Sequence, residues 1–299
     1  MIVEIGGGVF SQRIVNELSK RGISIKFSST SLKDFKFKEK IRNYPIIHYT
    51  GSPTVTIIGL LSLIRFKIWK KKIVVSWIGF DVRRIKHDFF WRLLTKLFKN
   101  LVDVHITEDD DAVNQLKKIG INAIIKKPPL YLIFPLKELP KEKKVAIYLP
   151  DKLDVDFNFY QGNLIKKLVN EFEDVSFIIV NNSGKYFTDN KNVKCIQWTD
   201  NMEEIYERVI CVIRLPLEDV TGATMIESLS MGRHMIASST NFPHCTIITN
   251  YNELRSSLSQ IIENPTQNVE GSYYVHKHYN NDLLASQFID LFKNLSTKN

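Results

Sequence analysis

An arginine, two acidic residues and a glycine lie close together in residues 209–238. An apolar run ends at Arg214, a polar loop with Asp219 and Gly222 follows, and a helical pattern that carries Glu227 comes next. We interpret the segment as a buried strand, a loop and a helix N-terminus, where backbone N–H groups attract anions and glycine lets a ligand approach the chain. Carboxylates accept hydrogen bonds from sugar hydroxyls. The segment therefore predicts a site for a nucleotide-sugar.

Residues 219–228 resemble the donor site of the retaining GT-B glycosyltransferases of the family four-like group, whose motif is written E-x7-E. Asp219 and Glu227 stand at the acidic positions and Gly222 at the inner glycine, whereas Val220 replaces the outer glycine. The alternative is an ordinary strand–turn–helix of an α/β protein, with Glu227 on a solvated face. The flanking segments are also similar to those of the group: the helix end, glycine stop and next strand in residues 229–236, and the strand, loop and short helix in residues 192–206.

The resemblance implies a role for each residue of the donor site. Glu227 would accept hydrogen bonds from the ribose and Asp219 from the hexose at the reaction centre, and Arg214 would help to hold the diphosphate. The N–H groups that would hold the diphosphate belong to Gly222, Ala223 and Thr224. The basic pair that the family carries early in its second domain is not visible in residues 148–160. The candidates to supply that charge are Lys152, Lys185 and Arg214, and a salt bridge to Glu218 is the alternative for Arg214.

Two residues of the first half are candidates for the reaction itself. Residues 76–82 resemble the W-x-G-x-D-V stretch that follows a central strand in many GT-B enzymes. Asp81 of this stretch would act as general base if the enzyme inverts configuration, or would orient the acceptor if it retains configuration. An N-cap is the alternative for Asp81. His48, at the end of the predicted strand Pro45–Tyr49, matches the family's histidine loosely, and a buried, hydrogen-bonded histidine is its alternative.

A glycine turn near the N-terminus predicts a tight connection between the first strand and the first helix. Gly6, Gly8 and Ser11 have the spacing of a dinucleotide fingerprint, but residues 28–30 are Ser, Ser and Thr where an NAD site needs an acid for the ribose. The resemblance to GT-B enzymes instead puts Gly7 and Gly8 near the donor phosphates or the acceptor.

We expect no cofactor and no metal site. Asp109 and Asp111 form a D-x-D pattern, but their position is typical of the first turn of a helix, where acids interact favourably with the helix dipole. His276 and His278 have no partner at zinc-ligand spacing.

Strand and helix patterns alternate along the chain, which predicts an α/β protein with parallel sheets. Prolines between residues 128 and 140 predict a linker. We expect two Rossmann-like doubly wound parallel-sheet domains facing across a cleft: residues 1–135 towards the acceptor and membrane, and residues 136–299 for the donor. The last helix, at about 281–296, is a candidate to cross back to the first domain. Other predicted helices cover Phe10–Lys20, Thr54–Trp69, Phe89–Phe98, the segment from an N-cap at Thr107 to Gly120, and Tyr160–Glu171.

Positive charge is concentrated in the first half of the chain. Residues 1–137 contain 25 Lys and Arg against 11 Asp and Glu, whereas residues 138–299 contain 16 against 21. Cations are mixed with Trp and Phe in residues 65–72 and around Trp91, and residues 83–86 add Arg83, Arg84 and Lys86. Such a surface suits anionic lipid headgroups, and it also suits nucleic acid. Because lipid-linked acceptors are common in the superfamily that the motif resembles, we favour an anionic membrane surface over nucleic acid.

The composition is typical of a soluble globular protein of two domains: 44% of the 299 residues are hydrophobic and 24% are charged. The cysteines at positions 195, 211 and 245 lack CxxC spacing and are expected to be reduced. No secretory signal pattern is visible, and the longest apolar stretch, about residues 55–64, is too short to span a bilayer. We therefore expect a cytoplasmic protein, peripheral on the inner face of the cell membrane.

The sequence thus predicts a metal-independent, hexosyltransferase-like glycosyltransferase that moves a sugar from a nucleotide-sugar to a glycan or lipid-linked acceptor. Three alternatives remain at this point: a sugar-nucleotide epimerase on the same fold, a basic nucleic-acid-binding protein, and a catalytically silent protein that only binds donors. The sequence leaves the base and sugar of the donor, the acceptor, the stereochemical outcome and the oligomeric state open.

Overall fold

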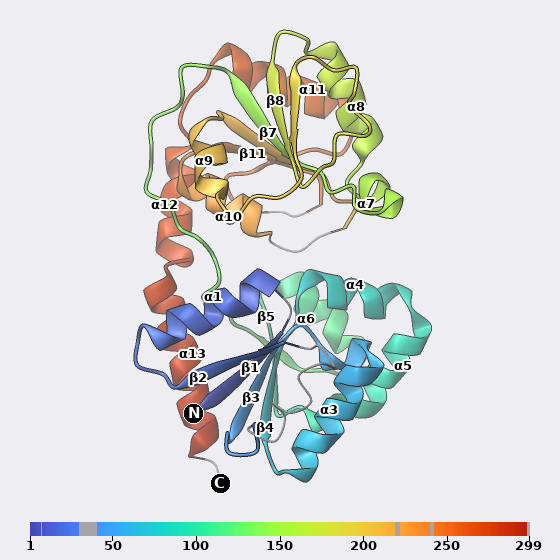
Figure 1. Ribbon diagram of the computed structural model, residues 1–299, viewed down its shortest axis with the longest axis vertical. Helices are drawn as coiled ribbons and strands as arrows, with labels where there is room; N and C mark the ends of the chain where they lie inside the picture. The colour runs from blue at the N-terminus through green and yellow to red at the C-terminus, as the bar shows by residue number, and fades with distance from the viewer. Residues whose placement is uncertain (7, 30–40, 219–221, 240–241, 298–299) are drawn as a thin grey trace. The chain divides into compact units, whose positions relative to one another are not determined.

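The computed structural model describes residues 1–297 except 7, 30–40, 219–221 and 240–241. The chain divides into two compact units (Figure 1). Unit 1 comprises Met1–Tyr131 and Tyr279–Asn299, and unit 2 comprises Leu132–His278. The boundary predicted from the sequence lies between residues 135 and 136. Within the described residues, every helix is too short or too polar to traverse a bilayer.

Unit 1 is built on a parallel sheet with the strand order β2-β1-β3-β4-β5-β6. The central strands are short apolar runs that are buried along their whole length, as expected for a parallel sheet covered on both faces. The strands are β1 (Ile2–Gly6), β2 (Ile25–Ser29), β3 (Ile46–Thr50), β4 (Lys72–Ser76), β5 (Val104–Thr107) and β6 (Ala123–Ile125). The helices are α1 (Gly8–Ser19), α3 (Ile57–Ile68), α4 (Gly79–His87), α5 (Phe89–Phe98), α6 (Asp110–Lys117) and α13 (Asn281–Ser296), with 3-10 turns η2 (Pro53–Val55) and η3 (Lys99–Leu101).

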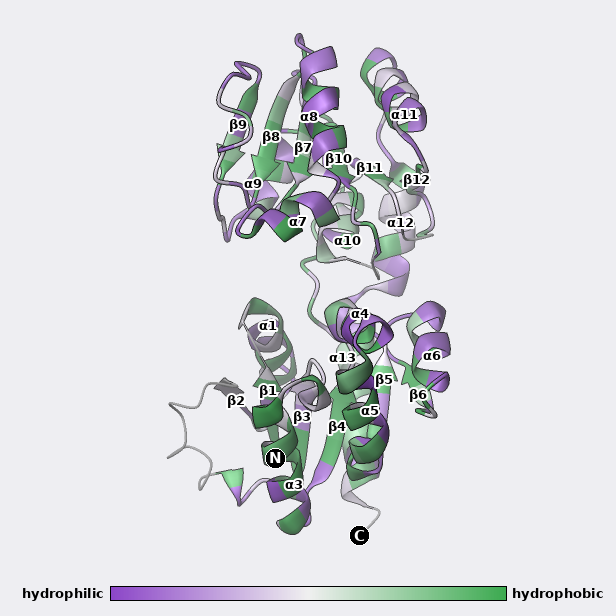
Figure 2. Ribbon diagram, turned by 90° about the vertical axis from the view of Figure 1, so that its right-hand side faces the viewer, coloured by the Kyte–Doolittle hydropathy of each residue, from purple (hydrophilic) through white to green (hydrophobic). Residues whose placement is uncertain are grey.

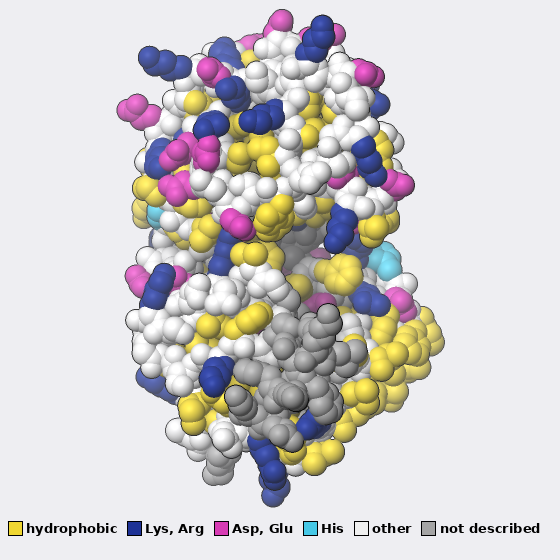
Figure 3. Space-filling model, viewed as in Figure 1, with side chains coloured by type: hydrophobic (Ala, Val, Ile, Leu, Met, Phe, Trp, Pro, Cys, Tyr) yellow, Lys and Arg dark blue, Asp and Glu magenta, His cyan; other side chains and the backbone are white. Residues whose placement is uncertain are grey.

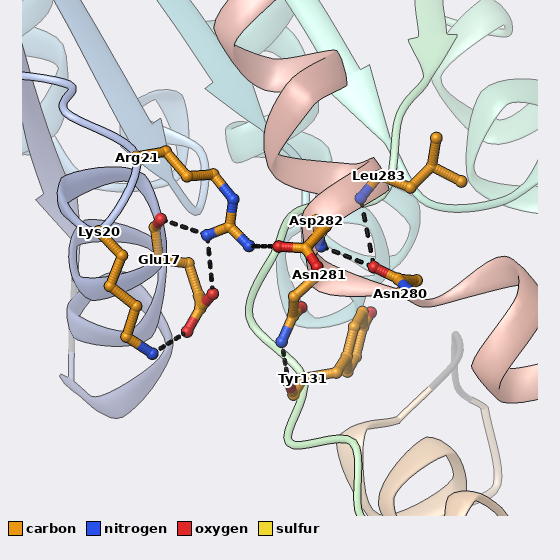
Figure 4. Close-up of polar contacts among 8 residues, drawn as sticks. All are labelled: Glu17, Lys20, Arg21, Tyr131, Asn280, Asn281, Asp282 and Leu283. Carbon is orange, nitrogen blue, oxygen red and sulfur yellow. Dashed lines mark hydrogen bonds and ion pairs between the residues drawn. The ribbon is translucent and has the colours of Figure 1, made fainter.

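The C-terminal helix α13 belongs to unit 1, where polar contacts hold its first turn (Figure 4). The side chain of Asn280 caps the helix by accepting from the N–H of Asp282 at 2.8 Å, and Asn281 donates to the carbonyl of Tyr131 at 2.8 Å. Arg21, in the turn that follows α1, forms an ion pair with Asp282 and a second one with Glu17 at 2.9 Å. Further along α13, Phe288 and Phe292 are buried against the sheet.

Unit 2 repeats the architecture with the strand order β12-β11-β10-β7-β8-β9, again with parallel pairing throughout the described strands. Its core lies between the sheet and helices such as α8, whose Ile165, Leu168 and Val169 are buried. The strands are β7 (Lys144–Tyr148), β8 (Ser176–Val180), β9 (Val193–Ile196), β10 (Cys211–Arg214), β11 (His234–Ala237) and β12 (Thr246–Ile247). The helices are α7 (Asp154–Phe159), α8 (Gly162–Glu171), α9 (Met202–Glu207), α10 (Ala223–Ser230), α11 (Tyr251–Glu263) and α12 (Val269–His278).

The predicted fold class, an α/β protein with doubly wound parallel sheets, is confirmed in each unit, but some helix boundaries differ. The helix predicted over Thr54–Trp69 is interrupted, because Thr56 is extended (φ −145°, ψ 145°) and its side chain caps α3 by accepting from the N–H of Gly59 at 3.0 Å. Thr107 is the last residue of β5 rather than an N-cap, and Asp109 caps α6 instead by accepting from the N–H of Ala112 at 2.8 Å. Helices α4, α7, α11 and α12 were not predicted.

Candidate functional site

The sheet of unit 2 has its topological switch point between β7 and β10. These strands are parallel neighbours, and the chain leaves them towards opposite edges of the sheet. Tyr148 ends β7 and Arg214 ends β10, so both residues stand at the carboxyl edge of the sheet beside the switch point. In open α/β sheets, ligands bind at this position.

Arg214 is held between aromatic rings at this edge. Its side chain is buried, and its Cζ lies 5.7 Å from the ring centre of Tyr148 and 5.6 Å from that of Tyr160. Burial raises the pKa of the Tyr160 phenol, and the neighbouring guanidinium of Arg214 opposes that shift. The rings thus orient the planar guanidinium, a group that binds phosphate through two parallel hydrogen bonds.

Gly222 lies against the Arg214 side chain. A β-carbon added to Gly222 would lie 2.8 Å from Cζ of Arg214 and 3.0 Å from its Nη1. The backbone of Gly222 (φ −93°, ψ 146°) suits any residue, so the absence of a side chain matters here for space and not for conformation. Glycine at this position lets the guanidinium reach the start of α10.

The N-terminus of α10 adds a second source of positive potential at the same point. Gly222 is its N-cap residue and accepts from the N–H of Met225 at 3.0 Å. The first N–H groups of a helix have no partner within the helix, and the helix dipole makes this end electropositive. The guanidinium of Arg214 and the first N–H groups of α10, including those of Ala223 and Thr224, therefore converge into a site suited to an anion.

Glu227 lies in the second turn of the same helix and is only 3% exposed. The hydroxyl of Tyr206, from α9, donates to its Oε2 at 3.2 Å. The alternative of Glu227 on a solvated face is therefore wrong. A buried carboxylate can accept hydrogen bonds from a ligand only in a defined geometry, which suits recognition of a ribose.

Hydrogen bonds fix the first part of the loop that follows β10, residues 215–217. Gln161 Nε2 donates to the carbonyl of Leu215 at 3.1 Å, and the N–H of Leu217 donates to the carbonyl of Phe159 at 2.9 Å. The carbonyl of Pro216 accepts from Ser238 Oγ at 2.7 Å. The loop therefore leaves the strand along a defined path, beside the rings that surround Arg214.

Lys152 and Lys185, the other proposed sources of positive charge, lie on segments that follow β7 and β8. Lys152 is exposed. Lys185 forms an ion pair with Asp154 at 2.8 Å and lies 4.7 Å from the ring centre of Tyr186. Of the three predicted cations, Arg214 is the one beside the N-terminus of α10. Asp219 and Gly7 lie outside the residues that the structure describes.

Sequence reasoning missed the residues that support this site. Three tyrosines from separate parts of unit 2 surround it: Tyr148, Tyr160 and Tyr206. From the sequence alone, a tyrosine at each of these positions indicates an ordinary core residue. Arg233, which follows the helix-ending Gly232, is fully buried and donates to the carbonyls of Tyr206 at 2.8 Å, Lys137 at 2.9 Å and Glu138 at 3.0 Å. It thereby fixes the end of α9, from which Tyr206 contacts Glu227.

In unit 1, Asp81 lies near the carboxyl ends of β3 and β4. Its Oδ2 accepts from the N–H of Ser52 at 2.6 Å and lies 3.4 Å from the β-carbon position of Gly51. It stands in the first turn of α4, whose N-cap is Ile78, so the predicted alternative of an N-cap is wrong. Burial raises the pKa of Asp81 to about 7, against the opposing hydrogen bonds from backbone N–H groups. A carboxyl with this pKa is suited to exchange a proton near neutral pH.

His48 lies in the middle of β3, not at its end, and belongs to a buried polar network. Its Nδ1 contacts Glu4 of β1, and its Nε2 lies 2.7 Å from Ser76 Oγ of β4. Thr50 donates to the other oxygen of Glu4 at 2.6 Å. The His48 ring is fully buried under Phe288, 5.6 Å away between ring centres. These contacts are typical of a histidine that joins strands.

Gly8 begins α1 with φ +74°, beside the switch point between β1 and β3.

Glu108, directly after β5, is a further buried carboxyl that the sequence did not single out. The hydroxyl of Tyr131 donates to it, and burial raises its pKa to about 7. The sequence could not show that Glu108 is buried, because it stands in a run of acids at residues 108–111. Only the tertiary structure distinguishes Glu108 from its neighbours in that run.

Two Rossmann-like units, each with a doubly wound parallel sheet, are the architecture of the GT-B fold. The chain is similar to sucrose-phosphate synthase (tll1590) from Thermosynechococcus elongatus, with a TM-score of 0.74 and 13% identity over 100% of both chains. It is also similar to Anabaena HepE (Alr3699) in complex with UDP-glucose, with a TM-score of 0.74 and 11% identity over 98% of this chain and 100% of that chain.

A putative UDP-N-acetylglucosamine 2-epimerase from Listeria monocytogenes is a third similar structure. It matches with a TM-score of 0.61 and 13% identity over 100% of this chain and 97% of that chain. No protein-family model matches the sequence, and no curated protein matches it. These similarities establish the fold of the chain over its full length.

Proposed function

We propose that the protein is a glycosyltransferase that moves a sugar from a nucleotide-sugar to a glycan or lipid-linked acceptor, without a metal. The observation that carries the proposal is the convergence of Arg214 and the N-terminus of α10 at the switch point, made possible by Gly222. The buried Glu227 one turn further along the helix adds an acceptor for sugar hydroxyls. The similar structure solved with UDP-glucose supports the choice of a nucleotide-sugar as ligand.

In this proposal the anion site stabilises the leaving group. The bond between the anomeric carbon and the diphosphate breaks, a bond to the acceptor oxygen forms, and negative charge develops on the nucleoside diphosphate. The guanidinium of Arg214 and the N–H groups of Gly222, Ala223 and Thr224 would hold this charge with dipoles that are already oriented. Glu227 would bind the ribose and Asp219 the hexose, and Lys152 would stand at the rim of the site.

The acceptor is assigned to unit 1. Asp81 would take the proton from the acceptor hydroxyl if configuration is inverted, and would orient the acceptor if configuration is retained. Gly7 and Gly8 would line the approach to the phosphates or the acceptor. The excess of Lys and Arg in residues 1–137 supports a lipid-linked acceptor at an anionic membrane, with the protein peripheral on its inner face.

Calorimetric titration of the full chain with UDP, UDP-glucose and other nucleotide-sugars tests the donor assignment. We expect Glu227→Gln to weaken binding of the preferred nucleotide-sugar roughly tenfold or more, because the neutral amide is a poorer acceptor for ribose hydroxyls. The matched control is Glu263→Gln, at an exposed position at the end of α11. Equal affinity of Glu227→Gln and the parent protein would remove Glu227 from the donor site.

A sugar-nucleotide epimerase is the second candidate, and the similarity to the putative 2-epimerase supports it. An epimerase converts the donor without an acceptor, so product analysis after incubation with the nucleotide-sugar alone separates the two activities. Release of the nucleoside diphosphate only when an acceptor is present supports transfer. Interconversion of two nucleotide-sugars without acceptor would replace the proposal. Donor binding without either reaction would indicate a silent donor-binding protein.

A further inference from the structure

Helix α3 of unit 1 exposes an apolar face in addition to the one it buries. Leu60, Leu63 and Phe66 pack inward. The opposite face carries large apolar side chains at helical spacing, and their exposed fractions are 62% for Ile57, 64% for Leu61, 36% for Ile64 and 73% for Ile68. A helix that is apolar all round normally has a partner on every side.

Helix α5 continues this surface. Thr95 is its one buried residue, whereas Phe89, Phe90, Leu93 and Leu97 are 72%, 54%, 44% and 64% exposed. The hydroxyls of Thr95 and Thr54 lie 2.8 Å apart and join α5 to the turn η2 that precedes α3. Figure 3 shows the hydrophobic side chains gathered over this part of unit 1, and the ribbons of α3 and α5 are predominantly green in Figure 2.

The segment that forms this surface is strongly basic. Residues 53–102 contain 11 Lys and Arg but only two acids, Asp81 and Asp88. Asp81 is buried, and Asp88 caps α5 by accepting from the N–H of Phe90 at 3.0 Å. On α5 itself, Arg92 and Lys96 are exposed one turn apart, next to the apolar residues.

The charge selects the partner for the apolar face. A second copy of the chain would bring the same basic segment against itself, because a two-fold interface joins identical patches. An anionic bilayer complements both features, since acyl chains accept Leu, Ile and Phe while phosphates attract Lys and Arg. Exposed apolar side chains with cations beside them are the arrangement of helices that lie in a membrane interface.

We infer that α3 and α5 insert their exposed apolar faces into the surface of an anionic bilayer, with Arg92 and Lys96 of α5 on the lipid phosphates. The inference rests on the proposed function in one respect: membrane binding would serve to bring unit 1 to a lipid-linked acceptor. The binding itself requires neither donor nor catalysis and is measured separately.

Sedimentation of the full chain with vesicles tests the inference. We expect binding to phosphatidylcholine vesicles that contain phosphatidylglycerol and little binding to pure phosphatidylcholine. The double variant Leu61→Asn/Leu97→Asn should lose roughly tenfold or more in partitioning, because each side chain contributes apolar area to the interface. Arg92→Gln/Lys96→Gln should weaken binding and reduce its dependence on salt. The matched control is Leu283→Asn/Val155→Asn, which changes exposed apolar residues of α13 and α7.

Calorimetric binding of the preferred nucleotide-sugar shows that each variant is folded and separates the two proposals. Loss of vesicle binding with intact donor binding in Leu61→Asn/Leu97→Asn supports the inference. Unchanged vesicle binding in this variant, or no binding of the parent protein to anionic vesicles, overturns it. Light scattering tests the other occupant. If the parent protein is a dimer and Leu61→Asn/Leu97→Asn is a monomer, the face binds a second copy of the chain, and the membrane inference is overturned. If the parent protein binds vesicles but no nucleotide-sugar, the proposed function fails and the membrane inference stands.

Discussion

Arg214 occupies the space that any side chain at position 222 would need: Cζ of Arg214 lies 2.8 Å from where a β-carbon on Gly222 would be. The two residues come from different elements, the end of β10 and the N-cap of α10. Their contact brings the guanidinium to the positive end of the helix. The candidate anion site therefore depends on this pair, and the donor proposal can be tested through it.

Replacing Gly222 with Ala should displace the guanidinium. The added methyl group overlaps the end of the flexible Arg214 side chain, which can move aside, so we expect a loss of no more than about 1 kcal/mol in the free energy of unfolding but at least about tenfold weaker binding of the nucleoside diphosphate. Urea unfolding and calorimetry measure the two effects. A double-mutant cycle with Arg214→Ala tests the cause: the Gly222→Ala effect on binding should largely disappear when the arginine is absent. Additive effects would contradict the prediction.

Tyr206→Phe removes the hydroxyl that donates to Glu227 at 3.2 Å. A buried carboxylate then loses one donor, and we expect the free energy of unfolding to fall by about 1–2 kcal/mol. Donor affinity should fall several-fold, because the carboxylate loses a contact that orients it. Tyr273→Phe, at a residue 67% exposed on α12, is the matched control. A variant as stable as the parent protein would show that this hydrogen bond contributes little.

The stability of unit 1 should decrease as the pH rises through neutrality. The pKa of Asp81 is about 7 in the folded protein, above its ordinary value, so the folded state binds the proton more tightly than the unfolded state. The stabilisation is fully present below the pKa that Asp81 has in the unfolded state. It is lost as the pH rises through the pKa that Asp81 has in the folded state. We expect the unfolding free energy of Asp81→Asn, relative to the parent, to increase by roughly 3 kcal/mol between about pH 5 and pH 8. Glu108→Gln should show the same sign, because the pKa of Glu108 is also raised to about 7.

The pH dependence of transfer addresses the role of Asp81 separately. A general base must be ionised, so kcat/KM should rise with pH through the pKa of Asp81, at about 7. Asp81→Asn should then lower the rate and abolish this rise. A rate that keeps its pH profile in Asp81→Asn would leave Asp81 with a positioning or structural role.

His48→Ala should mainly affect stability. The substitution leaves Glu4 and Ser76 without a buried partner and creates a cavity beneath Phe288, so we expect a loss of about 2–4 kcal/mol in the free energy of unfolding. Donor affinity, measured where the variant is fully folded, should stay unchanged. If the variant instead keeps its stability but loses transfer, His48 takes part in the reaction.

The alternation of elements could be predicted from the sequence because each unit is built from short apolar runs and amphipathic segments. Helix Phe89–Phe98 is predicted to the residue, since its apolar pattern ends sharply. The break at Thr56 could not be predicted, because its apolar neighbours continue a helical pattern while a threonine side chain caps a new helix. The exposed apolar face of α3 could not be predicted for a related reason: an apolar sequence pattern does not show whether another element covers the residues.

The sequence by itself determined which loop is the candidate donor site, because a polar stretch with arginine, acid and glycine between a buried strand and a helix is typical of a ligand-binding turn at the edge of a sheet. The tertiary structure alone decided which side chains meet. It placed Arg214 between Tyr148 and Tyr160, set Tyr206 on Glu227, and turned His48 inward to join strands. The physical reason is that spacing along the chain encodes local geometry, whereas the order of parallel strands, and therefore the neighbours at their ends, is set by packing across the whole sheet.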